Sequence, residues 1–152
     1  MPRGTVAAYP AQEAHRMATA AHTRKIFVRS DTTAPSGSDE VDGAIDFQWN
    51  SSKTILDTTD FKDTTGAKTK LAGLEDGSGS IGGDWEQSDT PQTALRTGFN
   101  AGSLVYVTDL KDGTNGYTYP CLVESIDESG SVDGKNEVTY NLTQSGAKIS
   151  RP

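Results

Sequence analysis

The stretches SLVYVTDL (residues 103–110), YTYPCLVESI (117–126) and EVTYNLT (137–143) decide the fold. Apolar and polar side chains alternate along each of them, which is typical of a strand with one buried face. Their connections carry dipeptides that favour tight hairpin turns, namely Asp112-Gly113, Asn115-Gly116 and Asp133-Gly134. The three stretches therefore predict an antiparallel meander. Pro120 has no backbone N–H to donate, so its strand is expected at an edge of the sheet or at a bulge.

Shorter strands are expected before the meander. Ile45, Phe47 and Trp49 alternate with small or polar residues and predict a strand over residues 44–49 with one buried face. Weaker patterns predict strands at residues 23–30, 54–56, 69–74 and 80–86, and turn-forming residues predict a loop over 31–43. Residues 57–68 are polar and rich in Thr, so we expect an extended loop that projects from the sheet.

One helix is predicted, over residues 91–100. Asp89 is a good N-cap, Pro91 suits the first turn, and Gly102 ends the pattern. The abundance of Gly, Ser, Thr and Asp agrees with a mainly β chain. For these 152 residues we expect a single β-rich domain over 23–147, a basic arm over 1–22 and a short polar tail over 148–152.

The charge is unevenly distributed along the chain. Residues 1–29 contain five basic side chains and one acidic side chain, although the whole chain carries a net charge of −7. The body is therefore acidic, and it is not expected to bind nucleic acid, whose phosphates need a clustered basic surface. The sequence contains no apolar run long enough to predict a membrane span and no visible apolar leader, so synthesis in a cytoplasm is expected.

The segment GSGSIG (residues 77–82) fits the nucleotide-binding pattern GxGxxG. A dinucleotide site needs a helix directly after this turn, because the helix N-terminus binds the pyrophosphate. Here Gly83, Asp84 and Trp85 continue a strand-like alternation, so the pattern favours a flexible hairpin tip. Its glycines would also let another backbone or a bulky ring approach closely.

No catalytic, metal or cofactor site is predicted. Two sets of residues spaced by three could offer oxygen ligands to calcium, although solvated turns explain them better: Asp57, Asp60 and Asp63, and Asp109, Asp112 and Asn115. His15 and His22 have no third ligand or catalytic partner and are expected at the surface. Cys121 alternates with Tyr119 and Val123, which predicts a buried structural thiol rather than a nucleophile.

Tyrosines crowd the meander, at Tyr106, Tyr117, Tyr119 and Tyr140. They could form a platform of rings, which leaves a carbohydrate-binding β-sandwich module as an alternative function. Cross-strand aromatic pairs also stabilise sheets, and packing is the simpler interpretation. A hydrolase is the enzyme alternative, but no Ser-His-Asp or paired-carboxylate pattern can be placed, so the chain is expected not to be an enzyme.

Four segments in this order resemble the major tail tube protein family of long-tailed bacteriophages and related tail-like particles: LDTTDF (56–61), DGSGSIGGDWE (76–86), GFNAG (98–102) and NEVTYNL (136–142). The resemblance covers residues 45–147. It implies a mainly β fold, a small β-sandwich or β-barrel with one flanking α-helix. It further implies that six copies form a ring with a continuous inner β-barrel, and that rings stack into the hollow tail tube, a conduit for DNA ejection into the host.

The resemblance also implies partners and a location. The partners would be further copies of the chain and other tail proteins, namely the tape measure, terminator and distal tail proteins, while DNA passes through the lumen without specific binding. The location would be the virion tail, after synthesis in the host bacterial cytoplasm. A tail terminator or head-tail connector ring is the closest alternative, because such caps need not polymerise.

Contacts between subunits or rings are expected from the basic arm and from the projecting loop. The loop is too polar to pack in its own core and too long for a simple hairpin. The candidate contact residues are Arg3, Tyr9, Arg16 and Met17 in the arm, and Asp57, Thr58, Thr59, Asp60, Phe61, Lys62 and Asp63 in the loop.

Overall fold

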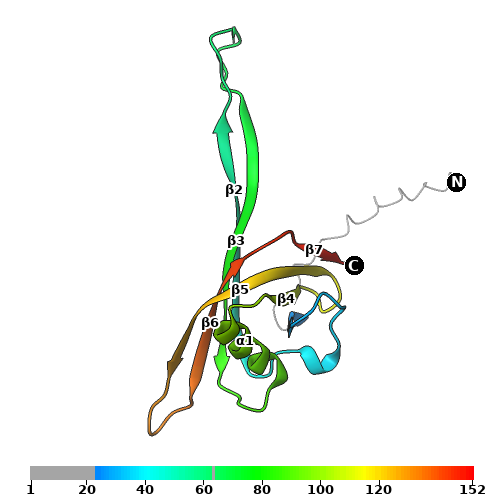
Figure 1. Ribbon diagram of the computed structural model, residues 1–152, viewed down its shortest axis with the longest axis vertical. Helices are drawn as coiled ribbons and strands as arrows, with labels where there is room; N and C mark the ends of the chain where they lie inside the picture. The colour runs from blue at the N-terminus through cyan, green and yellow to red at the C-terminus, as the bar shows by residue number, and fades with distance from the viewer. Residues whose placement is uncertain (1–22, 63) are drawn as a thin grey trace, which may run out of the picture.

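The fold is an antiparallel sheet with one helix packed on it, as seen in a computed structural model that describes residues 23–62 and 64–152 (Figure 1). The strands are β1 (Lys25–Arg29), β2 (Ala44–Asp57), β3 (Lys70–Asp84), β4 (Val105–Leu110), β5 (Gly116–Ser129), β6 (Glu137–Gln144) and β7 (Ile149–Arg151). The helix α1 spans Thr90–Ala101, and a short 3₁₀ turn, η2, spans Gly37–Asp39. The strand order is β1-β4-β5-β6-β3-β2, with β7 paired to β5.

This order leaves β1 and β2 as the two open edges of the sheet. The predicted mainly β class with one flanking helix is confirmed for the described part of the chain. A closed barrel is not a property of the single chain, because no ladder joins β1 to β2. Open edges present unpaired backbone groups, so any closure of the sheet needs neighbouring copies.

The predicted meander is confirmed: β4, β5 and β6 pair antiparallel in chain order. The expectation that Pro120 marks an edge strand is wrong, because β5 is paired on both sides. Pro120 instead lies where the strand pairing on one side of β5 is locally interrupted. The side of β5 opposite β4 pairs with β7 up to Thr118 and with β6 from Cys121 onward. The carbonyl of Pro120 accepts from Ser145 N at 2.8 Å on this side, so the missing N–H also faces the gap.

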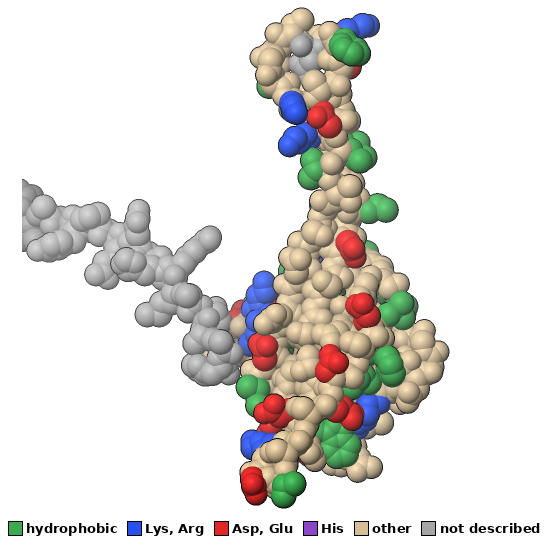
Figure 2. All heavy atoms as spheres, turned by 90° about the vertical axis from the view of Figure 1, so that its left-hand side faces the viewer, with side chains coloured by type: hydrophobic (Ala, Val, Ile, Leu, Met, Phe, Trp, Pro, Cys, Tyr) green, Lys and Arg blue, Asp and Glu red, His purple; other side chains and the backbone are tan. Residues whose placement is uncertain are grey.

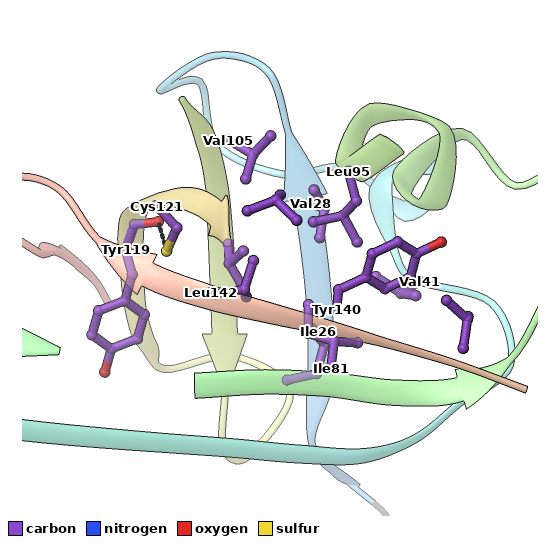
Figure 3. Close-up of a cluster of buried hydrophobic side chains, with 13 residues drawn as sticks. Ile26, Val28, Val41, Ile81, Leu95, Val105, Tyr119, Cys121, Tyr140 and Leu142 are labelled. Carbon is purple, nitrogen blue, oxygen red and sulfur yellow. Dashed lines mark hydrogen bonds between the residues drawn. The ribbon is translucent and has the colours of Figure 1, made fainter. Parts of the chain in front are cut away.

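The core lies between the curved sheet and α1 (Figure 3). Its fully buried members include Leu95 of the helix, Val107 of β4 and Leu142 of β6. Cys121 is also fully buried, as predicted, and burial raises the pKa of its thiol to about 12. The thiol donates to the carbonyl of Tyr119, and a buried thiol with a raised pKa is hardly ionised at neutral pH.

A buried amide ties the helix to the sheet, and sequence patterns gave no sign of it. Gln92 is 1% exposed, and its Nε2 donates to the carbonyls of Asp42 (3.1 Å) and Asp84 (2.9 Å). Its Oε1 accepts from Glu86 N at 3.1 Å and from the hydroxyl of Tyr140 at 3.2 Å. Every polar atom of the amide is thus used, which is how a buried amide is tolerated.

The helix has the predicted caps. The Asp89 carboxylate accepts from Gln92 N at 3.2 Å, and Gly102 adopts a left-handed φ of 65° beyond the last turn. Burial raises the pKa of the Asp89 carboxyl, and backbone hydrogen bonds from Gln92 and Asp42 oppose this shift.

Asp89→Ala is expected to lower the free energy of unfolding by about 1 kcal/mol, because an N-cap acceptor is lost. Asp89→Asn is the matched control: it keeps the acceptor, avoids a buried charge, and should change stability by less than about 0.5 kcal/mol. Urea denaturation of the two variants checks this. Equal losses for Ala and Asn would show that the charge, and not the cap, matters here.

The upstream strands are longer than predicted. The stretches 44–49 and 54–56 belong to one strand, β2, and the strands predicted at 69–74 and 80–86 merge into β3, which begins at Lys70 and ends at Asp84. The expectation of a hairpin tip at residues 77–82 is wrong, because this glycine-rich segment pairs with β2 on one side and β6 on the other. As expected, the glycines permit close approach: a Cβ on Gly79 would collide with the Trp49 ring and the Gln48 carbonyl.

Two further expectations need correction. Ile45 is 73% exposed, so only Phe47 and Trp49 of the predicted buried face pack on the core. The C-terminal residues form a strand rather than a polar tail, since β7 pairs with residues 116–118 and Arg151 Nε donates to the Thr118 hydroxyl at 2.9 Å. Among the described residues, no helix is long and apolar enough to cross a membrane.

Candidate assembly surfaces

The β2–β3 hairpin extends far beyond the body of the molecule (Figure 1). β6 pairs with β3 only from Ser78 onward, so the outer half of the hairpin has no other strand beside it. We call residues 53–74 the hairpin extension. The predicted projecting loop is the turn at its end, where Thr58 N donates to Thr69 O at 2.9 Å.

The hairpin extension carries apolar side chains on both faces. The cross-strand pairs Ile55–Ala72 and Leu56–Leu71 are adjacent, and adjacent pairs point to opposite faces. All large apolar side chains of this segment are exposed, and the most exposed are Leu74 (89%) and Phe61 (fully). Strands that are apolar on both faces are normally covered on both faces, so the hairpin extension has the composition of an interface.

The candidate contact residues of the loop gather at the end of the hairpin. Asp57 accepts from the Thr59 hydroxyl (2.6 Å) and backbone N (3.0 Å), and these bonds hold the pKa of its carboxyl below the usual range. Asp60 accepts from Lys62 N at 2.8 Å. Asp63 lies outside the described residues, as do Arg3, Tyr9, Arg16, Met17 and both histidines, so these assignments stay predictions.

The calcium hypotheses gain no support in the described part of the chain, where no group of acidic, His or Cys side chains is arranged to hold a metal. Asp109 is engaged by Arg24. Asp112 instead closes the β4–β5 turn, accepting from the backbone N–H groups of Thr114 (2.8 Å) and Asn115 (2.6 Å). These bonds lower the pKa of Asp112 to about 2, as in a solvated turn.

The side of the sheet away from the core forms a polar face. The register places outward residues side by side across four strands: Gln48 with Ser80, Ser80 with Asn141, and Asn141 with Ser125. Asn141 Nδ2 donates to Ser125 Oγ at 2.8 Å and to Asp127 Oδ2 at 2.7 Å. The centre of the face is a shallow hollow of about 580 Å³.

The polar face is acidic and contains no cation. Its segments are residues 46–52, 76–82, 122–127 and 139–143, which include four carboxylates, at Asp46, Asp76, Glu124 and Asp127, and neither Lys nor Arg. Figure 2 shows Asp and Glu side chains spread over the body, while Lys and Arg lie at its margins and on the hairpin. Such a face repels polyanions at close range.

Aromatic and ionic contacts anchor the base of the hairpin to the body. Trp49 of β2 stacks on Tyr119 of β5, with ring centroids 4.2 Å apart. Arg24 donates from Nε and Nη2 to the two oxygens of Asp109, both at 2.7 Å, and its guanidinium lies 4.7 Å from the Phe47 ring. None of these contacts had a signal in the sequence, because the partners lie on distant strands.

The tyrosines do not form one platform. Tyr140 is 1% exposed and faces the core, and Tyr119 is 6% exposed. Tyr106 is half-buried, so Tyr117 is the only exposed member of this set of four. Tyr117 lies 6.3 Å from Tyr119, in a tilted arrangement. Packing therefore explains the tyrosines, and the carbohydrate-binding alternative is not favoured.

The fold is similar to that of chains in solved structures of a virion and of two tails. It superposes on a chain from the virion of a native gene transfer agent (GTA) particle with a TM-score of 0.70 and 18% identity, covering 88% of this chain and 98% of that one. A chain from the tail of an empty GTA particle with C6 symmetry superposes with a TM-score of 0.70 and 19% identity, covering 88% of this chain and 98% of that one. A chain of the SPP1 tail tube superposes with a TM-score of 0.66 and 18% identity, covering 88% of this chain and 79% of that one.

These similarities establish the fold. No family model matches the sequence, and no curated protein matches it. The fold is thus shared at sequence identities below 20%.

Proposed function

We propose that the chain is a structural protein of a virion tail: six copies form a ring, and rings stack into a hollow tube through which DNA is ejected. The observation that carries the proposal is the match over 88% of the chain to tail chains, one of them from a C6-symmetric tail. The open edges β1 and β2 fit the same role, because six sheets joined edge to edge have no free edge left. The role needs neither catalysis nor a cofactor.

The polar face is the surface that we assign to the lumen. It is the hydrophilic side of β2, β3, β6 and β5, the four neighbouring strands that would form a continuous wall. DNA carries about one negative charge per ~1.7 Å of its axis, so a cationic wall would hold it and an acidic wall lets it slide. Asp46, Asp76, Glu124 and Asp127 would supply that acidic lining.

Polymerisation is favoured over a cap. A tail terminator or head-tail connector binds one ring face only, whereas the hairpin extension is apolar on both faces and would be covered by neighbours. Contacts with a tape measure, a terminator and a distal tail protein at the ends of the tube, assembly in the host bacterial cytoplasm and passage of DNA without specific binding complete the proposal.

Negative-stain electron microscopy of the purified protein tests the proposal. Long hollow tubes are expected at high protein concentration. Closed single rings that never stack would favour the cap, and a monodisperse monomer at every concentration would overturn the tube assignment. Imaging after dilution is the control, because a self-assembled tube shortens or dissociates below its critical concentration.

A further inference from the structure

The loop between β1 and β2 folds back over the outer edge of β1. Glu40 forms an antiparallel bridge with Phe27, and Val41 N donates to Ile26 O at 2.9 Å. Figure 1 shows this segment, coloured light blue to cyan, looping back beside β1. We call residues 31–40 the strap. β1 is the last strand of the sheet, yet part of its outer edge is already covered in the single subunit.

Ion pairs hold the strap against β1. The Arg29 guanidinium, at the end of β1, donates to Asp31 Oδ1 from Nε at 2.9 Å and to Asp39 Oδ2 from Nη1 at 2.6 Å. Lys25 Nζ, at the start of β1, lies 3.8 Å from Glu40 Oε2. The hydrogen bond from Arg29 is the main cause that lowers the pKa of the Asp31 carboxyl to about 2. The Arg29–Asp31 pair is therefore charged at neutral pH.

The strap is held from the surface and not by the core. All its residues are exposed or half-buried, whereas Val41, which follows it, is 7% exposed and belongs to the core. One further tether is the bond from Arg151 Nη2 to Thr32 O at 2.7 Å. Ion pairs that water reaches contribute little each, and salt weakens them. The strap can therefore leave β1 while Val41 stays in place.

A β2 strand from a second copy would compete with the strap for the edge of β1. Ile26 O points away from β4, and backbone groups alternate in direction along a strand, so those of Val28 point outward as well. The Phe27–Glu40 bridge lies between these two residues and blocks a second strand there. β2 has a free side along its 14 residues, so exchange replaces one bridge by a longer ladder.

We propose that the strap is an autoinhibitory contact: it covers β1 in the free subunit, and β2 of a second copy displaces it when the two sheets join. This inference rests on the proposed tube, in which β1 and β2 of neighbouring copies meet, and it names the step that delays their joining. A covered edge also protects the free subunit from pairing with unrelated strands. Free subunits thus stay apart until a neighbouring β2 favours the open form.

A reversible disulfide across the bridge tests the strap. Phe27→Cys/Glu40→Cys places the new cysteines directly opposite each other in an antiparallel pair, at a spacing that suits a disulfide. Oxidised subunits are expected to give no sedimentable polymer, because the strap can no longer leave. Reduction should restore the tubes, and the reduced sample is the matched control because its sequence is the same. Tubes from fully oxidised subunits would overturn the proposal.

Loosening the strap gives a second readout that leaves the buried Phe27 in place. Arg29→Gln removes the ion pairs to Asp31 and Asp39, and is expected to lower the critical concentration for tube formation about threefold, because the exchange no longer breaks them. Lys111→Gln at the β4–β5 turn removes the same charge away from the strap and should leave the critical concentration unchanged.

The Arg29 variant decides the question if the cysteine variant does not fold. An unchanged or raised critical concentration for folded Arg29→Gln, with circular dichroism as the check of folding, would show that the strap does not restrain assembly. Failure of the wild-type protein to form tubes would instead overturn the proposed function.

Discussion

Deletion of residues 60–66 is expected to give a folded subunit that no longer forms tubes. These residues lie in the turn of the hairpin, are exposed wherever they are described, and contribute nothing to the core. The bond from Thr58 N to Thr69 O joins residues on either side of the deleted segment and is kept, so the shortened hairpin can close again. Far-UV circular dichroism and the melting temperature should match the wild type, while the sedimentable polymer falls to background.

The matched control replaces residues 60–66 with seven Gly and Ser residues. It restores the length of the turn without Phe61 and Lys62, and it should also fail to assemble if side chains make the contact. Assembly by the Gly/Ser variant alone would show that length is what matters. Normal tubes from the deletion would show that the turn is not an assembly element.

Arg24→Ala is expected to lower the free energy of unfolding by about 3 kcal/mol, the lower end of the range for breaking a buried ion pair. Asp109 is 2% exposed and would keep a negative charge without its bidentate partner. The lower end applies because the Arg24 side chain is 32% exposed, and water can reach the site. The variant also removes the contact between the guanidinium and the Phe47 ring. Urea denaturation followed by tryptophan fluorescence measures the loss.

Asp109→Asn provides the control for this prediction. Added to Arg24→Ala, it removes the unpaired charge. It should recover at least about 1 kcal/mol of the lost free energy of unfolding, because a neutral buried amide costs less than an unpaired buried carboxylate. A double-mutant cycle quantifies the coupling between the two residues. Additive losses would mean that the ion pair contributes little and that Arg24 acts through packing alone.

Local patterns predicted the elements whose stabilising contacts are close in sequence. The meander follows from alternation and turn dipeptides, and the helix follows from Asp89 and Gly102, all of which act within a few residues. The buried position of Cys121 follows from the same alternation. The likeness to tail proteins rested on the order of short segments, and the agreement of the fold with solved tail chains shows that this order carries real information.

The features that were missed depend on distant partners. The glycine-rich segment of β3 has the composition of a turn, yet it is a strand because β2 and β6 pair with it and Trp49 covers Gly79. The Arg24–Asp109 pair joins residues 85 positions apart, and no local pattern predicts it. β7 was missed because three residues are too few to show an alternation.

The strand order has a kinetic consequence. The ladders β4–β5–β6 join residues within 105–144 and close small loops. By contrast, β1 can pair only once β4 is present, with Lys25 opposite Leu110, and β3 can pair with β6 only once Thr143 lies opposite Ser78. Loop closure must precede such long-range pairing, which slows it. The C-terminal meander is therefore expected to form first, and the strands that precede it in the sequence then pair with it. A nascent chain cannot complete its sheet until residue 151 has left the ribosome. The edges β1 and β2, which we propose join neighbours, would therefore become competent only in finished subunits.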